Sequence, residues 1–143
     1  MTLASVKAIE RGRALFNGRH FFQAHEAWEE AWLAEKGARR RILQGLIQLA
    51  AAFHKIARGD EPGGCLRLLE WGRVKIEGPA KSLPSLDLAG FRSRIRAFEE
   101  RAQRWERGEE ARPGSFPRLR REQTGRQRTS RARTRRSRKT SPS

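Results

Sequence analysis

His25 and Glu29 are the residues of this sequence whose types and spacing point most directly to chemistry. They are four residues apart, so a helix of about 100° per residue places them on one face, about one turn apart. The aromatic residues of the same segment, Phe21, Phe22, Trp28 and Trp32, share that face. Two ionisable groups inside an aromatic surface lose hydration unless they are paired. The pattern therefore predicts an enclosed site built on this pair.

Three interpretations of the pair follow from its chemistry. A His and a carboxylate at i and i+4 can converge on one divalent metal ion. The run here reads HExxE and not the HExxH of zinc proteases, so a zinc site needs a further protein ligand. His54 is the best candidate for that ligand, ahead of His20 and Glu26. Without a metal, Glu29 would orient His25 as a general base, or the pair would be a structural hydrogen bond.

Helices must position these residues. Apolar spacing predicts five of them, at about residues 1–17, 21–35, 38–58, 64–77 and 87–107. The third has two adjacent apolar stripes, one of which carries His54, and this indicates a central helix with neighbours on both sides. Gln48 on that helix either bridges two helices or faces solvent, and we include it in the candidate site together with Trp32. Since no alternating run predicts a strand, we expect an all-α fold, a compact bundle of about five helices.

Two helix ends carry specific signals. Gly18 after Asn17 is a predicted stop in the left-handed conformation that glycine tolerates. Asp87 is a predicted N-cap for the fifth helix. Leu86 before it and Phe91 after it occupy the positions of a hydrophobic staple.

Positive charge is concentrated at the C-terminal end of the chain. The 143 residues carry a formal net charge of +16, and residues 112–143 contain 12 Lys+Arg against one acidic residue. The apolar pattern stops after Gly108, and Pro113, Gly114 and Pro117 interrupt any further helix. We therefore predict a helical domain over residues 1–110 and a disordered Arg-rich tail over residues 111–143, which cannot bury enough apolar area to offset its ordering entropy.

The tail predicts a polyanion as partner. Arginine binds phosphate in a bidentate way, and counterion release drives such binding without reading sequence. We expect nucleic acid or another polyanion to bind the cationic residues of the tail; the alternative is a solubilising extension with no dedicated partner. These residues are Arg126, Arg128, Arg131, Arg133, Arg135, Arg136, Arg138 and Lys139.

Composition narrows the cellular context. Cys65 is the single cysteine, so an intramolecular disulfide is excluded, as is a Cys-rich metal site. No apolar run approaches the roughly 18 residues of a membrane span, and the N-terminal residues lack the apolar centre of a secretory signal. We expect a cytoplasmic protein that does not enter a membrane.

Two blocks of the sequence, residues 16–32 and 43–60, resemble a small helical family of bacteria and archaea catalogued as domain of unknown function 309. The family signature H-x-x-x-E-x-x-W is met by His25, Glu29 and Trp32. The resemblance extends over about residues 4–107 and leaves out the Arg-rich tail. It implies a compact helical bundle in which the His/Glu motif has a proposed metal-binding role.

The leading hypothesis from the sequence is a helical bundle whose site, formed by His25 and Glu29 with His54, binds a divalent metal ion. The alternative is a non-enzymatic, nucleic-acid-associated protein that binds through its tail. A third hypothesis is a scaffold in which the His–Glu pair is only structural.

Overall fold

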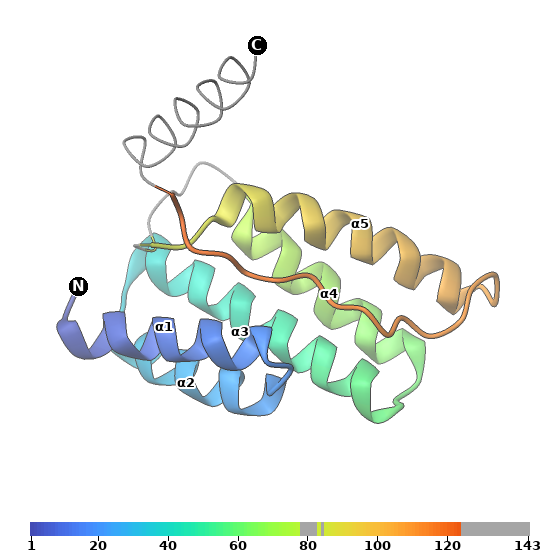
Figure 1. Ribbon diagram of the computed structural model, residues 1–143, viewed down its shortest axis with the longest axis horizontal. Coiled ribbons are helices and arrows are strands. Elements are labelled where there is room, and N and C mark those ends of the chain that lie inside the picture. Colours follow the sequence, from blue (N-terminus) through green and yellow to red (C-terminus); the bar gives the residue numbers. More distant parts are fainter. Residues whose placement is uncertain (78–82, 84, 124–143) are drawn as a thin grey trace, which may run out of the picture.

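The described part of the chain contains five α-helices (Figure 1). The computed structural model describes residues 1–77, 83 and 85–123. The helices are α1 (Leu3–Asn17), α2 (Phe21–Ala34), α3 (Gly37–Arg58), α4 (Pro62–Ile76) and α5 (Leu88–Glu106). The prediction of an all-α bundle of about five helices is confirmed. Within the described residues, none of the helices has the length and apolar character that a membrane span requires.

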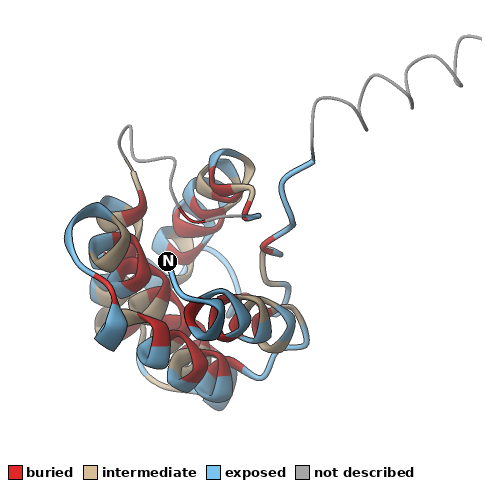
Figure 2. Ribbon diagram, turned by 90° about the vertical axis from the view of Figure 1, so that its left-hand side faces the viewer, coloured by how far each residue is buried: buried red, intermediate tan, exposed pale blue. Residues whose placement is uncertain are grey.

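The helix α3 lies at the centre of the bundle, as its two apolar stripes predict. It packs against α2 on one side and α4 on the other, while α1 packs against α2 and α5 against α4. The buried faces of the helices point toward this common core (Figure 2). Gly45 and Gly72 let α3 and α4 approach closely, since a Cβ on Gly45 would lie 2.9 Å from the carbonyl oxygen of Gly72.

One of the two predicted helix ends is confirmed and the other is corrected. The Asp87 carboxylate accepts a hydrogen bond from the backbone N–H of Gly90, and Leu86 and Phe91 are both buried, as in a hydrophobic staple. The end of α1 differs from the prediction. Gly18 has a φ of −83°, and the left-handed residue is Arg19, with a φ of 66°.

Residues 111–123, here called the strap, pack on the helices. The ring of Phe116 contacts the rings of Phe21, Phe53 and Phe98 at centroid distances of 5.0, 5.4 and 5.7 Å. Leu119 is completely buried. The prediction that a disordered tail begins at residue 111 is therefore wrong for residues 111–123. Proline and glycine prevent a helix here, but they do not prevent an extended segment from burying two large apolar side chains.

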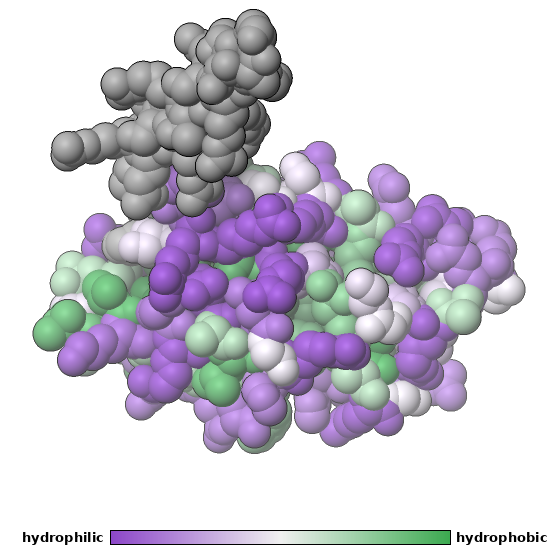
Figure 3. All heavy atoms as spheres, in the orientation of Figure 1, coloured by the Kyte–Doolittle hydropathy of each residue, from purple (hydrophilic) through white to green (hydrophobic). Residues whose placement is uncertain are grey.

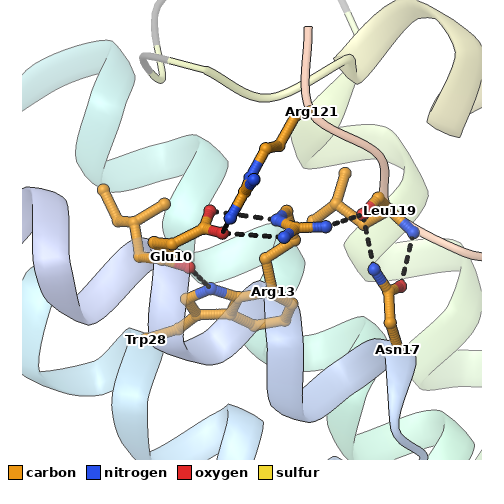
Figure 4. Close-up of polar contacts among 7 residues, drawn as sticks. Glu10, Arg13, Asn17, Trp28, Leu119 and Arg121 are labelled. Atoms are coloured by element: carbon orange, nitrogen blue, oxygen red, sulfur yellow. Dashed lines mark hydrogen bonds and ion pairs between the residues drawn. The ribbon is translucent and has the colours of Figure 1, made fainter.

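Side chains of α1 form hydrogen bonds with the backbone of the strap (Figure 4). The Asn17 side chain donates to the carbonyl oxygen of Leu119 and accepts from its N–H, both at 2.8 Å. Arg13 donates to the same carbonyl oxygen at 3.3 Å. These bonds satisfy the backbone polar groups of a residue whose side chain is in the core, which a buried extended segment requires.

Glu10 of α1 adds a charged contact with the strap. Its carboxylate accepts hydrogen bonds from Arg13 at 2.7 Å and from Arg121 at 2.9 Å. The hydrogen bond from Arg13, then that from Arg121 and the charges of both arginines, lower the pKa of Glu10 from 4.5 to about 2 against the opposing effect of burial. Glu10 thus joins the strap to the first helix by an interaction that depends on its ionisation.

The depressed pKa of Glu10 predicts a pH-dependent loss of stability. The ionised carboxylate stabilises the folded state above pH 4.5, and this stabilisation disappears as the pH falls toward 2. Because the side chain is 36% exposed, we expect Glu10→Gln to cost about 1 kcal/mol at neutral pH. Urea unfolding of both proteins measures this difference. It should be constant from pH 7 to 5 and vanish near pH 2; a difference that is the same at every pH would contradict this account.

Candidate functional site

His25 and Glu29 lie one turn apart on α2, as predicted, but at the edge of the core. The Nδ1 atom of His25 lies 3.5 Å from Oε1 of Glu29, and the two side chains are 28% and 48% exposed. The prediction that both groups are enclosed by aromatic rings is therefore wrong for Glu29. The buried side of α2 carries Phe21 and Trp28. His25 and Glu29 lie on the neighbouring side of the helix, which borders the core.

The His25 imidazole has a buried nitrogen without a hydrogen bond. Nδ1 is inaccessible to solvent and forms no hydrogen bond with the described residues, although it is within ion-pair distance of Glu29. The distance between Nδ1 and the Glu29 carboxylate allows electrostatic attraction, but the angles do not meet the geometry of a hydrogen bond. Since Nδ1 is buried, the exposure of the side chain comes from its other atoms, and the site contains a nitrogen without a hydrogen bond to the described residues.

His54 and His25 share an aromatic neighbour, Phe22. The Phe22 ring is 6.0 Å from the His25 ring, nearly parallel to it, and 5.6 Å from the His54 ring. Phe22 itself is 52% exposed. The two imidazoles and this phenyl ring therefore form a surface cluster between α2 and α3, with Glu29 at its border.

The predicted metal ligands are not assembled into a three-residue site. Among the residues that the structure describes, no three His, Cys, Asp or Glu side chains are grouped closely enough to hold a metal ion. His25 and Glu29 form one pair, and Phe22 contacts both His25 and His54. His20 and Glu26, the weaker candidates, are both exposed.

Trp32 and Gln48 occupy different surroundings. Trp32 is half-buried on α2; its Nε1 is buried without a hydrogen bond, and the Arg40 guanidinium lies 4.0 Å from the centre of its ring. Gln48 accepts a hydrogen bond from Lys75 at 2.9 Å and so bridges α3 to α4. This bond bears out the helix-bridging role predicted for Gln48, while its place in a site with His25 stays a prediction.

The arginines of the strap divide into two kinds. Arg112 donates to the backbone oxygens of Ile56, Gly59 and Asp60, which closes the C-terminal end of α3, and it stacks on Trp105 at 4.5 Å. Arg121 is paired with Glu10. Two others, Arg118 and Arg120, are exposed and form no ion pair with the described residues.

The sequence did not signal that any of these arginines is structural. The other predicted polyanion ligands, from Arg126 to Lys139, lie outside the described residues.

Comparison with known proteins identifies the family. Residues 9–67 match the family described as "Domain of unknown function (DUF309)", and the chain belongs to it. The chain is also similar to the crystal structure of a conserved hypothetical protein from Thermus thermophilus, with 33% sequence identity and a TM-score of 0.55. That similarity covers 64% of this chain and 94% of the other. No curated protein matches the sequence. The family match includes His25, Glu29 and His54 and ends before the strap.

Proposed function

We propose that the protein binds nucleic acid through its cationic C-terminal residues, and that the helical domain is the scaffold that fixes where those residues begin. Residues 124–143 contain seven arginines, one lysine and no acidic residue. Guanidinium groups bind phosphate oxygens with two hydrogen bonds, and the release of counterions from a polyanion supplies the free energy of binding.

The observation that carries the proposal is the attachment of the strap. The N–H of Asp87 donates to the carbonyl oxygen of Arg120 at 2.9 Å, and the N–H of Glu122 donates to Ser85 at 2.8 Å. The chain is thus held by backbone hydrogen bonds up to residue 122, close to where the cationic run begins. A polyanion bound there would be kept close to the domain.

Neutralising the tail should remove most of the binding. In the full-length chain, we expect glutamine at all eight cationic positions of residues 124–143 to weaken binding of a single-stranded oligonucleotide at least tenfold at 0.1 M salt. The slope of log K against log salt is negative, and its magnitude should decrease by about 0.7 for each phosphate that the variant no longer neutralises. Fluorescence anisotropy titrations at several salt concentrations measure both quantities.

A tail of shuffled order but unchanged composition is the matched control, and it should bind like the wild type because electrostatic binding does not depend on order. An unchanged affinity and slope in the neutralised variant would refute the proposed function.

A second candidate function rests on the orphaned nitrogen of His25. Two ligands on a tetrahedral zinc ion are about 3.4 Å apart, given metal–ligand distances of about 2.1 Å. The Nδ1 to Oε1 distance of 3.5 Å in the pair with Glu29 is close to that spacing. The spacing of the pair therefore supports two protein ligands to a divalent cation, and the described residues group no third protein ligand with them. The same pair without a metal would orient the imidazole as a general base.

Zinc titration separates a two-ligand site from a three-ligand site. We expect His25→Ala and Glu29→Gln each to weaken Zn²⁺ binding at least tenfold, measured by isothermal titration calorimetry on protein without an affinity tag. His54→Ala should leave the affinity within about twofold, since only two side chains converge. An equal loss in His54→Ala would show that the third ligand joins the site, and no binding by the wild type would exclude a cation.

A further inference from the structure

Two hollows flank the strap, one on each side of Ser115, Phe116 and Pro117. The first, of about 250 Å³, lies against the end of α1, and the second, of about 210 Å³, lies against α5. The buried residues Phe16 and Phe98 line one hollow each, and the partly buried Phe116 lines both. Figure 3 shows this side of the molecule, where hydrophilic residues cover much of the surface around smaller hydrophobic patches.

Arginines line both hollows, and among the described residues that line them none is acidic. Arg19 and Arg118 line the first, and Arg94 and Arg101 line the second. Arg101 and Arg118 form no ion pair with any described residue, whereas Arg94 is 3.7 Å from Asp87. Four guanidinium groups are thus gathered beside one short segment, with a single carboxylate near one of them.

The backbone of the strap keeps these arginines together. Arg94 donates through Nε to the carbonyl oxygen of Arg118, while its Nη2 is buried without a hydrogen bond. Arg19 lies 4.8 Å from the centre of the Phe116 ring. Cationic side chains on both sides of one segment create a positive local potential that attracts an anion. The arrangement therefore favours a ligand that carries more than one negative charge.

We propose that the two hollows form a contact for the phosphodiester backbone of a single-stranded nucleic acid, in addition to the cationic tail. This inference rests on the proposed function and adds a folded binding surface to it. Each hollow combines two arginines with the partly buried Phe116, and a nucleotide likewise combines a phosphate with an apolar sugar face. A single-stranded nucleic acid carries one phosphate on every nucleotide, so its charges are spaced along one chain and can contact arginines on both sides of the strap.

The test reverses one unpaired charge in each hollow of the full-length chain. Arg101→Glu with Arg118→Glu should weaken binding of a fluorescein-labelled 20-nucleotide single-stranded DNA at least tenfold at 0.1 M salt. It should also reduce the slope of log K against log salt by about 1.4, the value for two phosphate contacts on a single strand. The matched control is Lys7→Glu with Arg67→Glu, which makes the same change in net charge at exposed positions outside both hollows.

The control pair should change affinity less than threefold, because Lys7 and Arg67 line neither hollow and exposed charges that make no direct contact are screened by salt. Equal losses of affinity in the two double variants, with circular dichroism confirming that both are folded, would overturn the inference. So would polyglutamate of matched charge competing as well as unlabelled oligonucleotide.

The tail-neutralised chain distinguishes this inference from the proposed function. If neutralisation has no effect, the tail assignment fails, and the comparison between the two double variants still decides the role of the hollows. If the tail-neutralised chain keeps a residual salt-dependent affinity, Arg101→Glu with Arg118→Glu in that background should abolish it. Residual binding that survives this addition would also overturn the inference.

Discussion

The two hydrogen bonds between the Asn17 side chain and the backbone of Leu119 are the interaction on which the strap depends. They satisfy the polar groups of an extended residue whose side chain lies in the core, more than a hundred residues away in sequence from its partner. With Leu119 held in this way, Phe116 can enter the aromatic cluster, and the strap is bonded to α1 on one side and to α5 on the other.

The strap also decides what each arginine does. Arg112 and Arg121 are used by the fold, one on carbonyl oxygens and a ring, the other on a carboxylate. Arg118 lies between them in sequence without an ion pair among the described residues and lines an open hollow. Basic composition alone does not separate these roles, because guanidinium groups bind carbonyl, carboxylate and phosphate oxygens alike. The role of each arginine depends on where the fixed backbone of the strap places its side chain.

Much of the fold could be predicted from the sequence, because amphipathic helices produce a local periodicity. The two apolar stripes placed α3 at the centre, and the Asp87 cap was recognisable from its neighbours. The strap was not predictable in the same way. Its core contacts come from two residues, Phe116 and Leu119, among prolines and arginines, and their partners are distant in sequence. A pattern that depends on long-range contacts leaves no periodic signal.

The sequence predicted the positions of the candidate site residues better than it predicted their burial. His25, Glu29 and His54 do lie on neighbouring elements, and Phe22 contacts both imidazoles. The error concerned which side of α2 is buried. Successive residues of a helix point in directions about 100° apart. The side of α2 that carries Phe21 packs on the core, so Glu29 remains at the surface.

Amide hydrogen exchange of residues 111–123 tests most directly whether the strap belongs to the folded domain. The N–H of Leu119 donates to Asn17, and we predict that it exchanges as slowly as amides in the middle of α3, with the Glu122 N–H also protected. Exchange of the Leu119 amide at the rate of an unstructured peptide would contradict the account, because the strap would then neither complete the core nor hold the arginines beside the hollows.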